Sequence, residues 1–147
     1  MENFFYEDEL KQKIKTSLLE KQALEWAKHF IDRERKTRDK PLSSSQLRKF
    51  HFEVKTIEER LNNKIKQSEI PEKTDDEFSK MKPFIKLLKS KVAYACRTPG
   101  KERKVPETFK KYIDDMIDKI HDYKDFKAFS LCFDAVVGYF YGEGGSR

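Results

Sequence analysis

Apolar side chains recur every three or four residues along most of the chain, which is the period of an amphipathic α-helix. The clearest row lies between residues 47 and 61, where apolar positions are separated by 3, 4, 3 and 4 residues. Its members are Leu47, Phe50, Val54, Ile57 and Leu61. Similar rows predict helices over roughly residues 5–38, 106–123 and 125–141, and one more helix whose apolar row spans 81–95 and which ends at the TPG of 98–100. The expected core face of the third helix carries Met81, Phe84, Ile85, Leu88, Val92 and Ala95.

The second helix has a strong start signal in the stretch PLSSSQLRKF. Ser43 suits the N-cap and Gln46 the third helical position, which together make a capping box. Leu42 and Leu47 then stand where a hydrophobic staple would close over that first turn. We therefore expect this helix to begin directly after Ser43.

The other helix boundaries are marked less strongly. The acidic stretch PEKTDDEF at 71–78 is either a loop or the opening turn of the third helix. Pro83 fits only near a helix start or at a kink, because proline lacks the amide hydrogen. Pro106 suits the first position of the fourth helix. Asp125 has the side chain of an N-cap for the fifth helix, and Gly142 suits its end.

The chain length of 147 residues suits a single domain, which we divide into three parts. Residues 1–40 are expected to form a long, half-polar N-terminal helix that can project and pack against another chain. Residues 41–141 form the core bundle. The last stretch, GEGGSR at 142–147, is expected to be a frayed tail. The predicted fold is thus an all-α helical bundle of about five helices.

Composition agrees with a helical bundle that has a thin core. Hydrophobic residues make 37% of the chain and charged residues 39%, so much of the charge must lie on exposed helix faces. Five glycines and five prolines are too few for the many turns of a β-sandwich. No apolar run approaches the length of a membrane span, and the N-terminus lacks the order of a secretory signal. We expect a cytoplasmic protein with reduced thiols and no membrane contact.

The positive charge is concentrated in one part of the sequence. The chain has a net charge of +6, yet residues 79–104 alone carry nine basic side chains against one acid. Such asymmetry suggests a polyanionic partner, and a solvated helix face is the equally weighted alternative.

No combination of residues points clearly to catalysis, and no cofactor is expected. Cations around Cys96 would favour its thiolate, but a catalytic cysteine also needs a base and an oxyanion donor. Cys96 and Cys132 both sit among apolar residues, so a buried filler is the favoured role. The three histidines, His29, His51 and His121, lie on three different predicted helices. The carboxylates Asp114, Asp115, Asp118 and Asp122 are better explained as a solvated face than as a metal site.

Three stretches, in this order and spacing, carry a family resemblance. They are SSSQLRKFHFEVKTI at 43–57, LLKSKVAYACR at 87–97 and DYKDFKAFSLCFDAVVGYF at 122–140. Together the chain resembles the small α-helical subunit of the type III-A CRISPR–Cas interference (Csm) complex. The matched motifs are Ser44 to Phe50, Lys91 to Ala95, Asp125 to Phe129 and Asp134 to Tyr139. The resemblance covers roughly residues 40–141.

The resemblance implies a non-enzymatic, RNA-binding structural subunit. Several copies would stack beside the subunits that hold the CRISPR RNA and line the path of the target RNA paired to the guide. The implied partners are CRISPR RNA, target RNA, other Csm subunits and copies of the chain itself. Guide pairing reads the sequence in such complexes, so the protein need only sense backbone and shape.

Six basic residues are the predicted phosphate-binding site. The family motifs support Arg48, Lys49, Lys91 and Arg97, and charge with helical position supports Lys55 and Lys89. Two other functions remain open at this point. One is a helical adaptor whose basic face meets an acidic protein, and a weaker one is a cysteine-dependent enzyme.

Overall fold

The computed structural model describes residues 3–31, 41–68, 73–97 and 104–145. Six helices lie in these ranges: α1 (Thr16–Leu19), α2 (Lys21–Ile31), α3 (Ser44–Ser68), α4 (Lys73–Ala95), α5 (Glu107–Asp118) and α6 (Tyr123–Gly142). The only strand-like feature in the described ranges is an isolated bridge between Tyr6 and Ile14. The predicted all-α, single-domain fold is confirmed.

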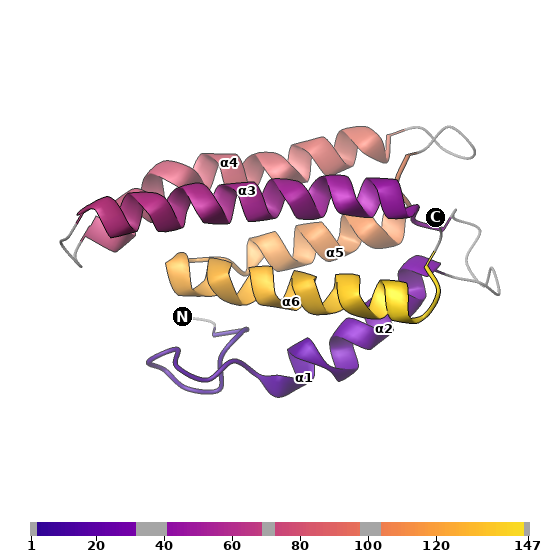
Figure 1. Cartoon of the computed structure of the whole chain (residues 1–147), viewed down its shortest axis with the longest axis horizontal. Coiled ribbons are helices and arrows are strands. Elements are labelled where there is room, and N and C mark those ends of the chain that lie inside the picture. Colours follow the sequence, from indigo (N-terminus) through magenta and orange to yellow (C-terminus); the bar gives the residue numbers. More distant parts are fainter. Residues whose placement is uncertain (1–2, 32–40, 69–72, 98–103, 146–147) are drawn as a thin grey trace.

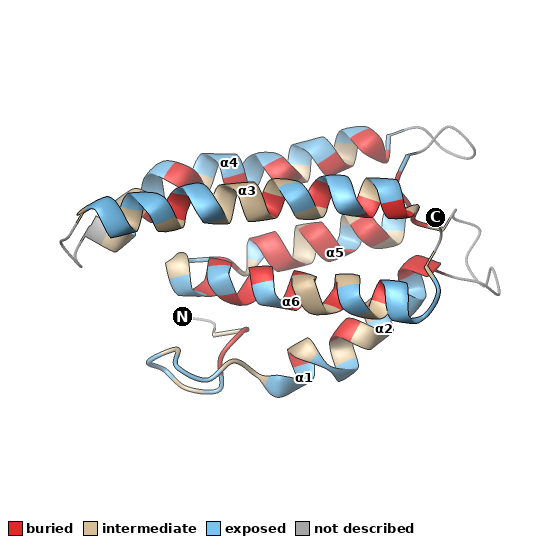
Figure 2. Ribbon diagram, viewed as in Figure 1, coloured by how far each residue is buried: buried red, intermediate tan, exposed pale blue. Residues whose placement is uncertain are grey.

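The helices form layers around a central helix (Figure 1). The long helices α3 and α4 run antiparallel and make one outer layer. Beneath them lie α5 and α6, and α2 packs on the far side of α6. Each of α3 and α4 shows alternating exposed and buried positions (Figure 2), and α5 buries one face, made of Phe109, Tyr112, Ile113, Met116 and Ile117.

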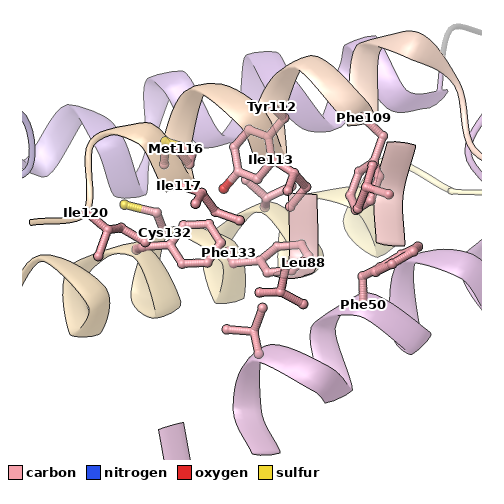
Figure 3. Close-up of a cluster of buried hydrophobic side chains, with 14 of the residues drawn as sticks. Phe50, Leu88, Phe109, Tyr112, Ile113, Met116, Ile117, Ile120, Cys132 and Phe133 are labelled. Carbon is pink, nitrogen blue, oxygen red and sulfur yellow. The ribbon is translucent and has the colours of Figure 1, made fainter. Parts of the chain in front are cut away.

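An aromatic cluster on α5 joins these layers. The rings of Phe109 and Tyr112 are fully buried, as are those of Phe30 from α2, Phe50 from α3 and Phe133 from α6. The centroid of Phe109 lies 5.4 Å from that of Phe30 and 5.6 Å from that of Phe50. Tyr112 lies 5.9 Å from Phe133 in the same cluster (Figure 3). Side chains from four helices therefore share one core, as close-packed interiors require.

The predicted start of the second helix is confirmed. α3 begins at Ser44, and the Ser43 hydroxyl accepts a hydrogen bond of 3.3 Å from the Gln46 amide. Leu42 and Leu47 are both fully buried, as a hydrophobic staple requires. The reciprocal half of the capping box is missing, because the side-chain oxygen of Gln46 has no hydrogen-bond partner among the described residues.

The third predicted helix starts earlier than its apolar row. α4 begins at Lys73 and includes Asp75 and Asp76 in its first turn, so residues 73–78 of the acidic stretch open the helix, and residues 71–72 lie outside the described ranges. Carboxylates are favoured there by the helix dipole. Pro83 lies well inside α4 and not near its start. Pro83 and Ser79, whose carbonyl would lose its helical partner, are both exposed, so water can satisfy that carbonyl.

The long N-terminal helix is not formed. Residues 3–15 are irregular, and helix begins only at Thr16 and again at Lys21. The helix α2 does not project in its described part: it buries Ala23, Ala27 and Phe30 against the bundle. Its expected charged end, at 32–40, lies outside the described residues.

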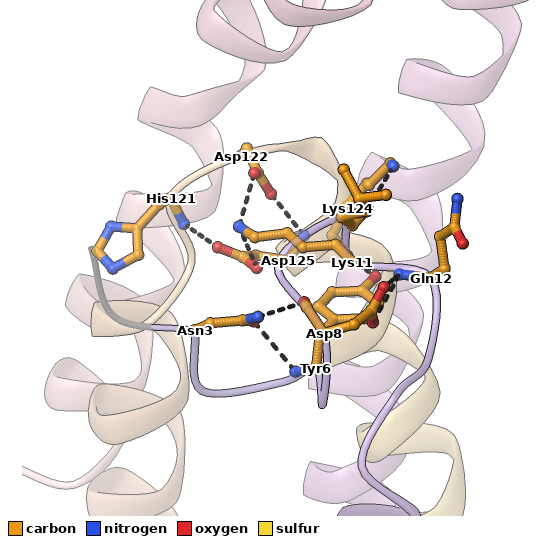
Figure 4. Close-up of polar contacts among 10 residues, drawn as sticks. Asn3, Tyr6, Asp8, Lys11, Gln12, His121, Asp122, Lys124 and Asp125 are labelled. Carbon is orange, nitrogen blue, oxygen red and sulfur yellow. Dashed lines mark hydrogen bonds and ion pairs between the residues drawn. The ribbon is translucent and has the colours of Figure 1, made fainter.

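A polar contact explains why the chain before α1 folds back on the bundle (Figure 4). The Lys11 ammonium donates hydrogen bonds to Asp122 at 2.7 Å and to Asp125 at 2.9 Å. Asp125 is 1% exposed and also accepts from the His121 amide at 2.9 Å. The Tyr6 hydroxyl donates to the Lys124 carbonyl at 2.6 Å. These contacts hold residues 3–15 against the start of α6.

α6 ends at Gly142 as predicted, but its N-cap and the residues after the helix differ from expectation. The N-cap is Asp122, whose carboxylate accepts from the Asp125 amide at 2.8 Å, so Asp125 is not the cap. At the other end the Gly145 amide donates to the Phe140 carbonyl at 2.7 Å and Gly144 has a φ of 81°. This is a Schellman motif, so residues 143–145 are an ordered cap instead of a frayed tail. Residues 146–147 lie outside the described ranges.

Replacing Lys11 by Met should destabilise the fold by about 3 kcal/mol, because it leaves a buried carboxylate without its cation. Replacing Lys13, an exposed neighbour in the same segment, by Met should change stability by less than about 0.5 kcal/mol. Urea unfolding of the two variants makes the comparison. Equal stabilities would show that the Lys11 contact does not hold the N-terminal segment.

Candidate nucleic-acid interface

Four of the six predicted phosphate-binding residues gather at one end of the α3–α4 pair. Arg48 and Lys49 lie in the first turns of α3, and Lys91 and Arg97 lie at the end of α4. Because the two helices run antiparallel, these ends meet (Figure 1). An ion pair of 3.1 Å between Lys91 and Glu53 bridges the two helices there.

Arg48 and Lys49 are exposed and available. Neither makes an ion pair with another described residue. The ammonium of Lys49 lies 5.3 Å from the centroid of the Phe50 ring, which anchors its stem without neutralising its charge.

Arg97 is held in place by Tyr94. Its guanidinium carbon lies 3.7 Å from the centroid of the Tyr94 ring, and its Nη1 donates to the Tyr94 carbonyl at 2.7 Å. Tyr94 itself is 66% exposed, so the stacked pair stands on the surface. A guanidinium fixed in this way loses little entropy when it binds an anion.

Lys91 and Lys89 carry carboxylate partners at the surface. Lys91 pairs with Glu53, and Lys89 pairs with Asp118 of α5. The hydrogen bond from Lys89 lowers the pKa of the Asp118 carboxyl below its usual range. Such exposed ion pairs contribute little to stability, so a phosphate can replace the carboxylate. Lys89 faces α5, however, and is not part of the group at the end of the pair.

Lys55 belongs to a polar network between α3 and α6. Its ammonium donates to Asp134 at 2.8 Å, to the buried hydroxyl of Ser130 at 2.9 Å and to Glu58 at 3.2 Å. His51 also lies 2.8 Å from Asp134. Burial by itself lowers the pKa of Lys55, but the hydrogen bond to Asp134 and the charge of Glu58 outweigh it and raise that pKa. Lys55 thus links two helices.

The sequence patterns did not predict a surface groove that lies between α3 and α4. It has a volume of about 190 Å³ and is lined by Phe52, Glu53, Thr56, Ile57, Arg60, Met81, Phe84, Leu87, Leu88 and Lys91. We call it the α3–α4 groove. Phe84 was expected in the core but is 54% exposed, and Phe52 is 72% exposed. Phe52 lies off the apolar row of α3, which is the only signal the sequence offered.

The cysteines lie away from solvent. Cys96 is 4% exposed and Cys132 is 1% exposed. Burial raises the pKa of the Cys132 thiol to about 12, so this sulfur stays protonated at neutral pH. Both positions match the buried-filler interpretation.

The described ranges contain no group of three or more possible metal ligands from histidine, cysteine and the acids. Asp114 pairs with Lys110 at 2.8 Å and Asp115 with Lys111 at 3.0 Å, as i,i+4 pairs along α5. None of the described helices is long and apolar enough to cross a membrane.

Lys55 can either link α3 to α6 or bind phosphate, and the two roles predict different effects of its removal on stability. If it mainly joins α3 to α6, Lys55→Met should lower stability by about 1–2 kcal/mol, because two partly buried carboxylates lose their cation. Lys49→Met, two turns earlier and without an ion pair in the described structure, should change stability by less than about 0.5 kcal/mol. Thermal unfolding of both variants tests this. A Lys55 variant as stable as the Lys49 variant would contradict the network's role.

Comparisons with known proteins supply the family. The family model Csm2 Type III-A matches residues 13–145, which is nearly the whole chain. No curated protein and no solved structure matches the chain. The matched range includes all of α1 to α6, the four basic residues at the end of the α3–α4 pair and the groove beside them. The chain belongs to the Csm2 family, the small subunit of the type III-A CRISPR–Cas complex.

Proposed function

We propose that this chain is a non-catalytic subunit that binds RNA phosphates, with several copies stacked along the guide–target duplex in antiviral defence. The observation that carries the proposal is the basic group at the end of the α3–α4 pair: Arg48, Lys49, Lys91 and Arg97. Family membership places the chain in a complex with other Csm subunits. The RNA contact is our inference.

The chemistry of these side chains fits a backbone and does not fit base reading. Arg48 and Lys49 are exposed in the first turns of α3, where their charged groups can reach phosphate oxygens. Phosphate contacts position a protein on nucleic acid without specifying sequence. In an RNA-guided complex the guide supplies the sequence, so this is sufficient.

The six predicted residues contribute unequally under this proposal. Arg48, Lys49 and Arg97 are unpaired or stacked on an uncharged ring, so they meet phosphate directly. Lys91 and Lys89 exchange a surface carboxylate for a phosphate. Lys55 contributes mainly by fixing α3 against α6.

Salt dependence tests the phosphate contacts. Arg48→Gln combined with Lys49→Gln should weaken binding to a guide–target RNA duplex and reduce the log–log salt slope by about 2, because roughly one counterion is released for each phosphate neutralised. The matched control is Lys21→Gln with Lys28→Gln, two exposed lysines on α2, on the far side of α6. It changes the net charge equally and should leave the slope nearly unchanged.

Equal slopes for the two double variants would mean that the effect is only a general charge effect. The named site would then be wrong, whatever the total affinity.

Co-purification tests the assembly. The tagged chain should bring down CRISPR RNA together with other Csm subunits from its own cells. The Arg48/Lys49 double variant should still recover the protein subunits and yield less bound target RNA. Recovery of acidic proteins without RNA or Csm subunits would favour the adaptor alternative.

A further inference from the structure

We propose that the α3–α4 groove receives the turn around Leu10 from a second copy of this chain, so that copies join head to tail. The inference rests on the proposed function, in which copies stack, and it names the two surfaces that would meet. It starts from two exposed apolar features of the described structure that lack a partner.

The groove offers an apolar floor with an open top. Ile57, Met81 and Leu88 line it, while Phe52, Phe84 and Leu87 stand 72%, 54% and 46% exposed at its edges. Exposed apolar side chains scattered singly are ordinary, but a contiguous set around a hollow marks an interaction site.

The second feature is a turn that exposes a leucine. Leu10 is 71% exposed at the tip of residues 7–13, which we call the Leu10 turn. The Asp8 carboxylate accepts from the amides of Gln12 at 3.0 Å and Lys13 at 2.8 Å. The Glu7 amide donates to the Lys13 carbonyl at 2.8 Å, and Lys11 has a φ of 56°.

The bundle holds this turn in place. The Lys11 ammonium is tied to Asp122 and Asp125, and the Lys124 ammonium donates to the Leu10 carbonyl at 3.0 Å (Figure 4). Because the backbone of the turn is fixed in this way, little backbone entropy is lost when Leu10 enters a groove, which is how preorganised loops gain affinity.

The charges around the two features are complementary. Glu7 and Glu9 are exposed beside Leu10. Arg60 on α3 and Lys91 on α4 line the groove, and Arg60 has no ion pair with another described residue. One acid, Glu53, also lines the groove and pairs with Lys91, so the positive charge that faces Glu7 and Glu9 is that of Arg60. The turn also has an exposed cation, Lys13, which would not attract Arg60. The attraction between the two surfaces therefore comes from Glu7 and Glu9.

Placement decides the symmetry of the contact. The Leu10 turn lies near the start of α6, and the groove lies on the opposite outer layer (Figure 1). The two surfaces differ, so the contact is heterologous and each copy keeps one free surface for the next. Growth of this kind produces a row of copies. A contact through one groove is small, and RNA that holds neighbours together would supply the missing affinity.

Complementary defects test the contact. Leu10→Asp removes the apolar tip, and Phe84→Asp places a charge in the groove; both sites are exposed, so neither change should unfold the chain. Sedimentation velocity on a guide–target duplex long enough for several copies should show rows for the unaltered chain. Each variant alone should add single copies. A 1:1 mixture should form pairs and nothing larger, because each pair has one intact turn in one intact groove.

The control is Leu131→Asp, on an exposed leucine of α6 outside both surfaces, which should form rows normally. A charge exchange adds a positive test: Glu9→Arg should weaken the row, and Arg60→Glu in the same chain should restore it.

Each other result overturns the proposal. Unimpaired rows in either Asp variant, or a mixture that forms no pairs, would mean that the two surfaces do not meet. An unaltered chain that binds the duplex only as single copies would do the same. If Phe84→Asp abolishes RNA binding by single copies while Leu10→Asp does not, the groove holds RNA instead. Unchanged RNA affinity of single copies in both variants separates this contact from the phosphate site.

Discussion

The packing of α5 in the centre of the bundle is the constraint on which the rest depends. Its side chains Phe109 and Tyr112 contact rings from α2, α3 and α6, so a single helix fixes the positions of three others. In a chain with only 37% hydrophobic residues, such sharing is how one core holds several layers. The arrangement has a cost at Tyr112, whose buried hydroxyl has no hydrogen-bond partner in the described structure. It also leaves the outer faces of α3 and α4 exposed to solvent.

Those outer faces show how weak surface ion pairs permit function. Lys91 and Lys89 are partly exposed and paired with carboxylates, and pairs of this kind add at most about 1 kcal/mol. They keep the basic stretch from repelling itself in the free protein, yet they yield easily to phosphate. Lys55 differs because three partners and partial burial hold it, so removing it would expose two carboxylates to each other. Under the proposed function, lysine therefore serves phosphate binding at one place and helix packing at another.

Sequence periodicity predicted the helical fold because each helix buries one face against the shared core. The start of α3 was predictable too, since the Ser43 cap is a local hydrogen bond. The N-terminal segment was not: its acids and apolar spacing suit a helix, but Lys11 meets Asp122 and Asp125 more than a hundred residues away. The helical spacing of Phe84 also predicted a buried side chain. In the structure Phe84 lines the groove between α3 and α4 and is 54% exposed, which depends on how the two helices pack. Of the predicted site, the four clustered residues carried family motifs. Lys55 and Lys89 were predicted from charge and helical position, which cannot reveal an ion-pair partner on another helix.

The Leu10 turn and the basic group differ in the range of the interaction that each would make. A contact with RNA phosphates is long-ranged and tolerant of position, so it needs only exposed cations on a fixed frame. A contact between copies is short-ranged, so it needs apolar atoms held in a fixed shape. Under the two proposals, the bundle meets the first need with the exposed side chains of Arg48 and Lys49. It meets the second by tying a short turn to α6 through the buried Asp125. Lys91 is common to both surfaces, since it lines the α3–α4 groove and also belongs to the basic group. Its release from Glu53 toward phosphate would leave that carboxylate uncompensated beside the groove, so the two contacts are electrostatically linked through one ion pair.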